Sequence, residues 1–588
     1  MTSPSGPAPA SQERVGDAPG AAQGSGTRSG PLAMGQVATA SASNGHPAPA
    51  VTRTGAADQA TSVRYDPGPL WARLLPPLVA LGMALWGITT PSFWRDEAAT
   101  IAAIRRPFGD LIVMLGNVDA VHSAYYITMW PLAHLFGYSE FVLRLPSAFA
   151  MALTAATVAA IGRRLISPWA GLAAGLLYAL VPVATRYGQE ARPYAAVVAM
   201  ATIASYLLVR VLTAEPERRR RWLVAYAAGL GALGIVNIFG LLLIPAHALT
   251  IGLAYRREAD RAAGRRLVVG WLAAAVAGVV VAGPLLDLGW RQRGQISWLS
   301  VNKSTSGVGT LLTLTGSIME SMSLVGVVIV ALVLSTAKPD AQRRAAWPRR
   351  LWELSLPWVI VPPLSLWVGT NLLTPVYTSR YILLCVPAIT LLAGAGVAAM
   401  GRVIGPVAIA IVLAAGGPFM LQIRGSAGHS DDIRTIDWVV SGQAQPGDVV
   451  LYTNPNAESF GAAYPTGLGT LPNVALNKPA ISSGTLAGTS VSLAEIQARL
   501  LNVRRVWVVE IGKCVTPPVL LGLSGAPVPG SSVLQGLPFQ FVRIWHEHED
   551  WLLLFARGAG SQAVTGPLAA WCKTQPQQYG AQPVGSRP

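Results

Sequence analysis

Two adjacent carboxylates, Asp96 and Glu97, are the residues best suited by type and spacing to acid–base chemistry. They lie in the stretch PSFWRDEAAT, shortly after the first long apolar segment ends. A carboxylate is costly to desolvate and does not anchor a chain in a membrane, so a pair at this position predicts a functional site. The alternative is a solvated helix start, where acids in the first turn are favoured by the helix dipole.

Arginine, tyrosine and histidine side chains follow in segments that we predict to lie on the same side of a membrane as the acidic pair. The guanidinium group carries a fixed charge and a planar fork of donors that suits phosphate. The acidic pair and these arginines together predict a base beside an anion site, although each arginine alone could be an interfacial anchor. The candidates for phosphate binding are Arg144, Arg192 and Arg380, and those for substrate binding are His122, Tyr126, Glu140, Tyr194 and Tyr381.

The composition places most of the chain in a bilayer. Hydrophobic residues make up 52% of the sequence and charged residues only 12%, whereas a soluble protein carries about 25% charged residues. Residues 71–421 alternate apolar runs of 16 to 21 residues with short polar breaks, and about 20 residues of helix cross a bilayer. We therefore predict a polytopic α-helical membrane domain with about eleven transmembrane helices. The predicted spans are 73–90, 145–162, 168–184, 195–212, 222–237, 239–254, 267–287, 318–336, 351–370, 381–399 and 403–421.

The basic residues predict the orientation of these helices. Of the net charge of +16, +15 falls within residues 71–421, where five alternate breaks hold 17 basic residues and the other breaks hold ten. The positive-inside rule then places the N-terminus in the cytoplasm and the chain after residue 421 outside, with a first outer loop over 91–144. Because membrane orientation explains the charge and no aromatic–basic binding module occurs, the sequence argues against nucleic acid as a partner.

Two parts of the chain flank the membrane domain. Residues 1–70 are rich in Gly, Pro, Ala, Ser and Thr, which predicts a disordered cytoplasmic tail and not a signal peptide. Residues 422–575 alternate helical and strand-like segments, which predicts a small extracytoplasmic α/β domain before a flexible end at 576–588. Cys514 and Cys572 are candidates for a disulfide there, and two unpaired buried thiols are an equal alternative.

The order of the outer motifs resembles a known class of enzymes. WRDEA is followed by H-x-x-YY, then FG-Y-SEF-x-LR-LPSA, then ARPYA and finally SRY. This order resembles the GT-C glycosyltransferases of the protein O-mannosyltransferase and lipid A aminoarabinose transferase type (glycosyltransferase family 39-like). The resemblance is specific over residues 90–200 and looser over the rest of the membrane part. It departs at His122-Ser123-Ala124, where relatives commonly have His-Pro-Pro.

The resemblance implies a sugar transfer from a polyprenyl-phosphate donor to an acceptor hydroxyl, with inversion, on the extracytoplasmic face of the plasma membrane. It assigns the general base to Asp96 and leaves Glu97 to support the acceptor or a divalent metal, Mg²⁺ or Mn²⁺. Arg144 matches the arginine of the family pattern. The chemistry is sensible on its own terms, because such a donor needs a carboxylate to take the hydroxyl proton and cations to hold the departing phosphate.

Other functions and several details stay open at this level. A lipid-linked sugar transporter or flippase is one alternative, but transporters commonly have internal repeats and charges at mid-membrane, which this sequence lacks. A membrane scaffold with an outer binding domain is another. The scarcity of lysine indicates a high-GC bacterial genome such as that of an actinomycete, so mannose is slightly favoured over arabinofuranose. The acceptor would be a cell-wall glycan, a glycolipid or a protein.

Overall fold

The computed structural model describes residues 68–295, 318–337, 349–372, 377–426 and 428–511, and then the shorter stretches 519–521, 527–529, 533–534, 537–547 and 550–558. The predicted tail 1–70, apart from its last residues, and the predicted flexible end 576–588 lie outside the described residues. Cys514 and Cys572 lie outside them as well, so their pairing stays a prediction.

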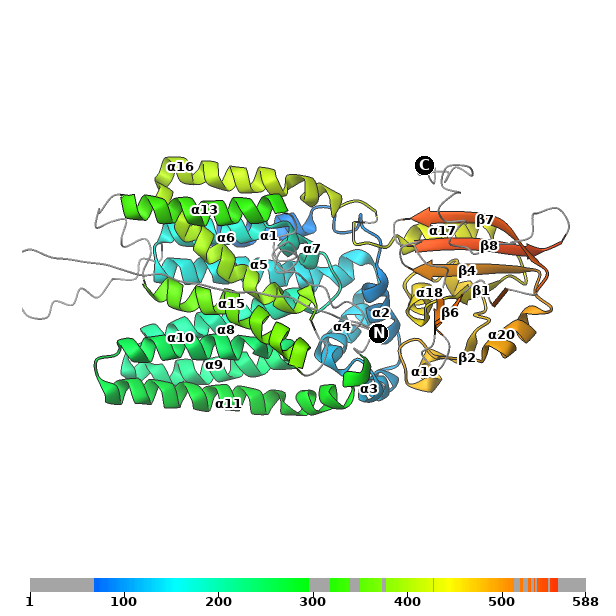
Figure 1. Ribbon diagram of the computed structural model, residues 1–588, viewed down its shortest axis with the longest axis horizontal. Helices are drawn as coiled ribbons and strands as arrows, with labels where there is room; N and C mark the ends of the chain where they lie inside the picture. The colour runs from blue at the N-terminus through cyan, green and yellow to red at the C-terminus, as the bar shows by residue number, and fades with distance from the viewer. Residues whose placement is uncertain are drawn as a thin grey trace, which may run out of the picture. The chain divides into compact units, whose positions relative to one another are not determined.

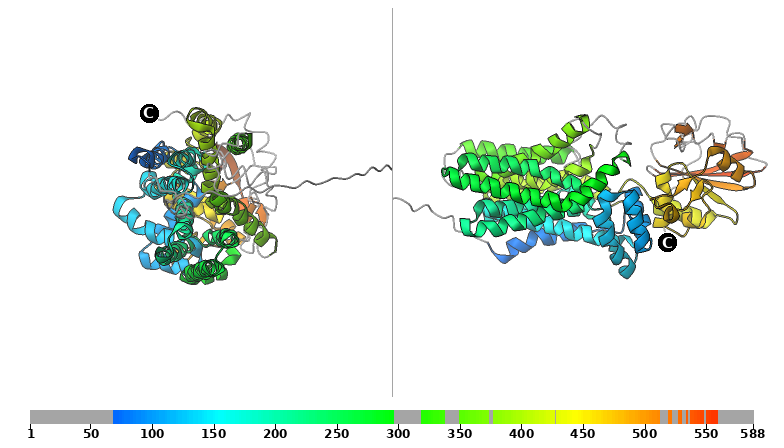
Figure 2. Two further views of the ribbon diagram at one scale, coloured as in Figure 1. Left: turned by 90° about the vertical axis from the view of Figure 1, so that its left-hand side faces the viewer. Right: turned by 90° about the horizontal axis from the view of Figure 1, so that it is seen from below.

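Long helices running side by side form the membrane part of the chain (Figures 1 and 2). Each of the predicted spans coincides with helical structure over most of its length, which confirms a polytopic helical fold. The helices are α1 (Leu70–Leu85), α5 (Glu140–Leu165), α6 (Pro168–Leu180), α7 (Pro182–Gly188), α8 (Tyr194–Thr213), α9 (Pro216–Val236), α10 (Leu243–Arg257), α11 (Arg261–Arg291), α13 (Ile318–Ala337), α15 (Arg349–Leu372) and α16 (Val386–Gln422).

Fewer than the predicted eleven spans are found when the described helices are judged by length and composition. Within the described residues, six helical segments are long and apolar enough to cross a membrane, or seven if the bent pair α6 and α7 is one span. The helix α1 has only 16 residues, and α9 opens with a run of arginines. The count of eleven therefore stays a prediction.

One of those long segments contains two helices. Gly401 has a φ of 83°, which interrupts α16. A Cβ placed on Gly405 would lie 2.8 Å from the carbonyl oxygen of Val397, whereas a straight helix would separate these positions by about 12 Å. The chain therefore turns back at Gly401, which fits the predicted boundary between spans 381–399 and 403–421.

Small residues bring α5, α6 and α16 into close contact. A Cβ on Gly162 of α5 would lie 2.8 Å from the Cα of Gly171 on α6, and one on Gly394 of α16 would lie 2.5 Å from the Cα of Ala174. Such contacts are typical of membrane helices, because lipid gives little hydrophobic drive for their association. After α6 the chain bends by 63° into α7, which leads to the ARPYA motif.

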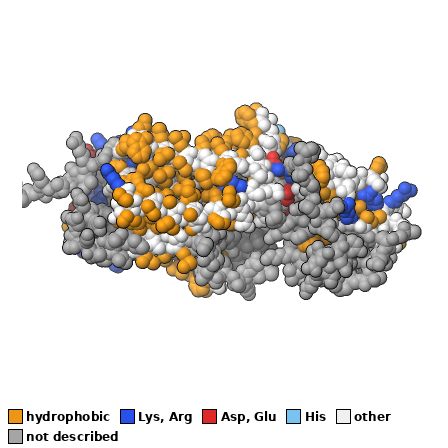
Figure 3. Space-filling model, turned by 90° about the horizontal axis from the view of Figure 1, so that it is seen from above, with side chains coloured by type: hydrophobic (Ala, Val, Ile, Leu, Met, Phe, Trp, Pro, Cys, Tyr) orange, Lys and Arg blue, Asp and Glu red, His pale blue; other side chains and the backbone are white. Residues whose placement is uncertain are grey.

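The surface of the bundle is strongly apolar. Figure 3 shows a broad field of hydrophobic side chains across one face of the molecule. Val269 and Val280 of α11 and Val403 and Ile411 of α16 are among the exposed apolar residues. Soluble proteins rarely expose contiguous surfaces of this kind. The protein is a multi-pass membrane protein.

The segment between α1 and α5 folds into short helices. These are α2 (Arg95–Ile104), α3 (Phe108–Asn117), the 3-10 helix η1 (Ala120–His122) and α4 (Ser123–Phe136). The longest of them, α4, has 14 residues, too few to cross about 30 Å of hydrocarbon. Phe108, Ile112 and Val113 of α3 are exposed, as expected for helices that rest on a membrane surface.

The region after α16 has the predicted α/β character (Figure 1). Its main sheet has the strand order β1-β4-β8-β7, with β1 parallel to β4 and the other neighbours antiparallel. The strand-like segments PGDVVLYT, RRVWVVEI, FQFVRIW and WLLLFA of the sequence each form a strand of this sheet. The main elements are α17 (Ile433–Gln443), β1 (Val449–Tyr452), α18 (Ser459–Ala463), α19 (Ala480–Ser483), α20 (Leu493–Leu500), β4 (Arg505–Ile511), β7 (Phe539–Glu547) and β8 (Asp550–Arg557), with the short strands β2 (Leu476–Lys478), β3 (Thr489–Ser490), β5 (Val519–Leu521) and β6 (Pro527–Pro529).

Candidate active site

Glu97 is sealed inside the protein by an ion pair. Its carboxylate accepts hydrogen bonds from Arg144 Nε at 2.8 Å, from Arg144 Nη2 at 2.6 Å and from the backbone N–H of Ala191 at 2.7 Å. Both side chains are fully buried. Burial alone would raise the pKa of Glu97, but the charge and hydrogen bonds of Arg144 hold that pKa far below its usual range. Glu97 is therefore a permanently ionised structural group.

Arg144 has no donor left for a phosphate. Its Nη1 donates to the carbonyl oxygens of Ile88 and Pro91, both at 2.8 Å, and its Nη2 donates to that of Ser92 at 2.9 Å. With the two bonds to Glu97, all five N–H groups of the guanidinium are used. In this geometry the side chain fixes the turn before α2, and its role in phosphate binding stays a prediction that these contacts do not favour.

Asp96, one residue earlier, lies at an accessible surface. Its Oδ2 accepts a hydrogen bond from Arg380 Nη1, and the two side chains are 22% and 26% exposed. Burial raises the pKa of Asp96, but the nearby charges of Arg380 and Arg192 outweigh burial and lower it. While Arg380 is bound to it, the nearby positive charge therefore makes Asp96 less basic despite its burial.

Arg192 connects the predicted substrate residues behind Asp96. Its Nη1 donates to the Tyr126 hydroxyl at 3.0 Å, and its Nη2 lies 2.6 Å from His122 Nε2. Because a guanidinium only donates, His122 Nε2 must accept, so the imidazole is neutral. Burial lowers the pKa of His122 to about 4, which agrees with this assignment. Tyr126 in turn donates to Asp119 at 2.5 Å.

The position of Arg192 differs from its predicted role. The side chain is 6% exposed and its terminal nitrogens are engaged with protein groups. One of these contacts is with the carbonyl oxygen of Asp96, at 3.4 Å. Arg192 thus holds the helix that carries Asp96, and it is poorly placed to receive a phosphate directly.

Two further residues, Arg186 and Glu190, belong to the site although neither is among the catalytic, phosphate-binding or substrate-binding residues predicted above. Arg186 Nη1 donates to Glu190 Oε2 at 2.9 Å. The guanidinium carbons of Arg186 and Arg380 lie 5.2 and 4.9 Å from the centre of the Trp94 ring. Burial raises the pKa of Glu190 to about 7. The signal that could have found the pair is the (i, i+4) spacing in TRYGQEARPYA.

The remaining predicted substrate residues are placed differently. Tyr194 is buried, and its hydroxyl lies 3.5 Å from Arg380 Nη1. Tyr381 stacks on Phe239 with ring centres 3.8 Å apart. Glu140 accepts bonds at 2.6 Å from both Arg434 and Tyr464, which belong to the α/β domain. Glu140 therefore joins two parts of the chain, and its role in substrate binding stays a prediction.

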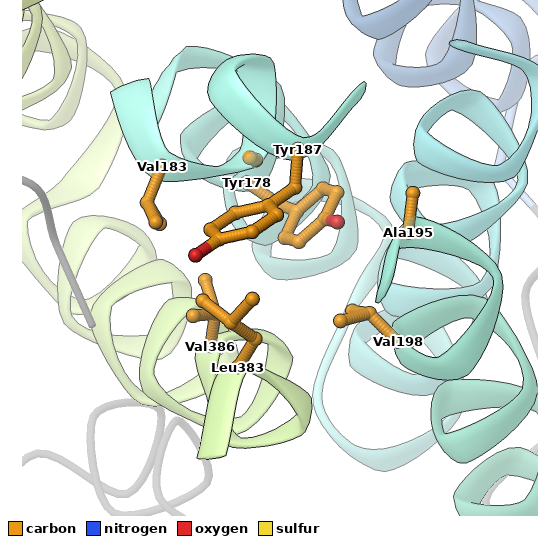
Figure 4. Close-up of a pocket in the computed structure, with 8 residues that line it drawn as sticks. Tyr178, Val183, Tyr187, Ala195, Val198, Leu383 and Val386 are labelled. Carbon is orange, nitrogen blue, oxygen red and sulfur yellow. The ribbon is translucent and has the colours of Figure 1, made fainter. Parts of the chain in front are cut away.

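An apolar pocket adjoins the Asp96–Arg380 pair. Its cavity volume is about 10 Å³, the room of about one water molecule. In Figure 4 the rings of Tyr178 and Tyr187 lie side by side, facing Leu383 and Val386. Tyr187 packs against Tyr194 with ring centres 5.6 Å apart, and Tyr194 contacts Arg380. The pocket lining is Tyr178, Val183, Ala184, Tyr187, Ala195, Val198, Leu383 and Val386.

The carboxylates do not fit a divalent-metal site. In the described part of the chain, no group of three or more His, Cys, Asp or Glu side chains could hold a metal ion. Asp96 is paired with Arg380 and Glu97 with Arg144, so the two carboxylates do not converge on a shared ligand position. The expected Mg²⁺ or Mn²⁺ site at Asp96 and Glu97 is therefore not supported by this arrangement.

Comparison with known proteins identifies the class of fold. A family model described as dolichyl-phosphate-mannose-protein mannosyltransferase matches residues 123–286. The chain has the fold of the GT-C glycosyltransferases, and the predicted resemblance to that class is confirmed.

Individual solved structures give the extent of the likeness. The apo structure of ArnT from Cupriavidus metallidurans matches with 13% identity and a TM-score of 0.52, over 82% of this chain and 97% of that one. The structure of the same protein bound to undecaprenyl phosphate matches with 13% identity and a TM-score of 0.53, over 83% and 99%. No curated protein matches the sequence. At this identity the likeness describes the fold, and the actinobacterial origin stays a prediction.

Proposed function

We propose that the protein transfers a sugar from a polyprenyl-phosphate donor to an acceptor hydroxyl, with inversion, on the extracytoplasmic side of the membrane. The observation that carries this proposal is the partly exposed Asp96–Arg380 pair beside an apolar pocket. A base and a phosphate-binding cation are the two groups such a transfer requires. The match of residues 123–286 to the dolichyl-phosphate-mannose-protein mannosyltransferase model, and the undecaprenyl phosphate bound in a protein of the same fold, support this proposal.

The apolar lining of the pocket matches the isoprenoid end of such a donor, and the pocket must widen to receive it. Its walls are aliphatic and aromatic side chains from membrane helices, and Tyr187 joins it to the charged site. An isoprenoid in this pocket would bring its phosphate toward Arg380, which contacts Tyr194 next to the pocket residue Tyr187. Arg186, whose guanidinium also lies near the Trp94 ring, is the second cation near that position.

Donor binding would also activate the base. A phosphate that binds Arg380 competes with Asp96 for the same guanidinium. Once Arg380 turns to the phosphate, the influence that lowers the pKa of Asp96 weakens while burial still raises it. The resting ion pair would thus keep Asp96 weakly basic until the donor is bound.

In the transfer step, Asp96 takes the proton of the acceptor hydroxyl as its oxygen attacks the anomeric carbon. The bond from that carbon to the phosphate oxygen breaks on the opposite face, and the departing polyprenyl phosphate carries away the electron pair. Arg380 stabilises the negative charge on this phosphate. Buried Glu97 and Arg144 touch neither reactant and hold α2 in place.

We infer the donor sugar and the acceptor class from the sequence. We retain mannose over arabinofuranose, with a glycan, glycolipid or protein as acceptor. We also retain a cytoplasmic N-terminus, since the dense basic loops then lie inside. A cysteine introduced between residues 338 and 350 should be labelled only from the cytoplasm, and labelling from outside intact cells would contradict the orientation.

The test is an assay in liposomes with sugar-labelled polyprenyl-phosphate mannose and polyprenyl-phosphate arabinofuranose and a panel of glycan, glycolipid and peptide acceptors. We expect one donor to yield free polyprenyl phosphate and labelled acceptor together. Asp287→Asn is a matched control, because Asp287 is an exposed carboxylate paired with Arg291 away from the site. Movement of intact donor across the bilayer without release would indicate a transporter, and no turnover of either donor would favour a scaffold.

A further inference from the structure

The helix that carries Asp96 is capped by the α/β domain. Helix α2 begins at Arg95, and the first N–H groups of a helix need partners from outside the helix. The backbone N–H of Arg95 donates to Asp431 Oδ2 at 2.7 Å, across 336 positions of sequence. The N–H of Trp94 is 3.4 Å from Glu97 Oε2, inside the same turn.

The side chain of Arg95 binds Asp431 as well. The guanidinium donates from Nε to Oδ2 at 3.0 Å and from Nη2 to Oδ1 at 2.6 Å. The Asp431 side chain is fully buried, and that of Arg95 is 28% exposed. Three hydrogen bonds that Arg95 donates to one buried carboxylate therefore fix the residue immediately before Asp96.

Asp431 is itself fixed to the α/β domain. The next residue, Asp432, caps α17 by accepting from the N–H of Thr435 at 3.2 Å. The N–H of Asp432 donates to Asp550 Oδ2 on β8 at 2.9 Å. Residues 431 and 432 thus connect the central sheet of the domain directly to the first turn of α2.

The apolar face of α2 belongs to the same unit. Ala98 and Ile101 share one buried hydrophobic cluster with Phe460 of α18 and with Trp507 of the sheet. An isolated helix of ten residues is marginal in water, so packing and capping must supply most of its order. Both come largely from the α/β domain.

We propose that Asp431 is a positioning residue for Asp96, so that the α/β domain completes the active site by fixing the helix that carries the base. The inference rests on the proposed function. It assigns a role to a domain whose contribution the sequence did not predict. Asp431 acts through Arg95 and α2 and does not touch the reactants.

A second interdomain contact provides a matched control. Arg434 Nη2 pairs with Glu140 of α5 at 2.6 Å and donates to the carbonyl oxygens of Thr89 and Pro91 in the turn before α2. The Arg434 side chain makes none of its described contacts with α2. Arg434→Gln therefore weakens docking without removing the cap, whereas Asp431→Asn keeps the size of the side chain but loses its charge.

The experiment compares kcat, the donor KM and the pH profile of kcat for wild type, Asp431→Asn and Arg434→Gln in liposomes. We expect Asp431→Asn to lower kcat by about tenfold to 100-fold with little change in the donor KM, since a small misplacement of a reacting group has effects of this size. The limb of the pH profile that reports Asp96 should shift in this variant only. Asp431→Glu should restore part of kcat.

Several results would overturn the proposal. Equal kcat values for Asp431→Asn and Arg434→Gln would show that the α/β domain binds the membrane domain without positioning Asp96. An unshifted pH profile in Asp431→Asn would show that the base is unaffected. If Asp431→Asn does not fold, Arg95→Lys provides the same test, because it retains the charge and loses the fork. A wild-type protein without transferase activity would refute the proposed function, which distinguishes that failure from a failure of the positioning role.

Discussion

Asp96 and Glu97 are neighbours in sequence, each bound to an arginine, and yet they belong to different regions of the molecule. Glu97 and Arg144 are fully buried, and every donor of the arginine is used. Asp96 and Arg380 are about one quarter exposed and lie beside an apolar pocket. The difference teaches that an ion pair is available for chemistry only where a ligand can replace one partner.

Mutation of the buried pair Glu97–Arg144 should lower the stability of the protein. Arg144→Ala leaves the Glu97 carboxylate ionised and unpaired in the interior, which costs about 3 to 5 kcal/mol. We expect a large fall in the unfolding temperature in detergent, or failure to fold. A variant that unfolds at the wild-type temperature would show that the buried pair contributes little.

Mutation of the exposed pair Asp96–Arg380 should lower activity and leave stability almost unchanged. Arg380→Lys retains the charge and loses the planar fork for phosphate. We expect donor turnover to fall by about tenfold to 100-fold, as for loss of one charge-stabilising donor, while the unfolding temperature changes little. Turnover at the wild-type rate in this variant would remove Arg380 from the phosphate site.

A third carboxylate, Glu190, should make stability depend on pH. Burial raises its pKa from 4.5 to about 7, so the folded state holds a proton that the unfolded state releases. Its contribution is fully present below pH 4.5 and is lost as the pH rises to about 7. Glu190→Gln should therefore flatten the decline of unfolding temperature between pH 5 and 8. An unchanged slope in the variant would contradict the raised pKa.

The smallest effect of mutation is expected at Glu140. It also forms an ion pair with an arginine, and both side chains are partly exposed. Its partners are Arg434 and Tyr464, and no described contact joins it to the Asp96 site. Glu140→Gln should cost about 1 kcal/mol of stability and leave turnover within about twofold of wild type. A loss of activity comparable to that of Arg380→Lys would support Glu140 as a substrate residue.

The sequence predicted the helices well because the length of an apolar run is set by the bilayer. It predicted the strands of the α/β domain for a similar reason, since segments such as RRVWVVEI are too short and too β-branched for a helix. The kink at Gly401 fell between two predicted spans. These features depend on residues near one another in the chain.

The site was predicted only in part because its pairings are distant. Arg144 and Arg380 lie 47 and 284 positions from the carboxylates they bind. Adjacent helical residues point about 100° apart, so one of a pair can be buried while the other is exposed. No local pattern shows which carboxylate finds the buried arginine, and that pairing decided the roles of Glu97, Arg144 and Asp96.

The most direct measurement is single-turnover sugar transfer by Asp96→Asn with a polyprenyl-phosphate donor in liposomes, beside the wild type. Asparagine keeps the shape of the side chain and cannot accept the proton. The account predicts a rate lower by about 10²- to 10⁴-fold with donor binding retained. A rate within about threefold of wild type would contradict it, because loss of a positioned general base cannot leave the rate so high.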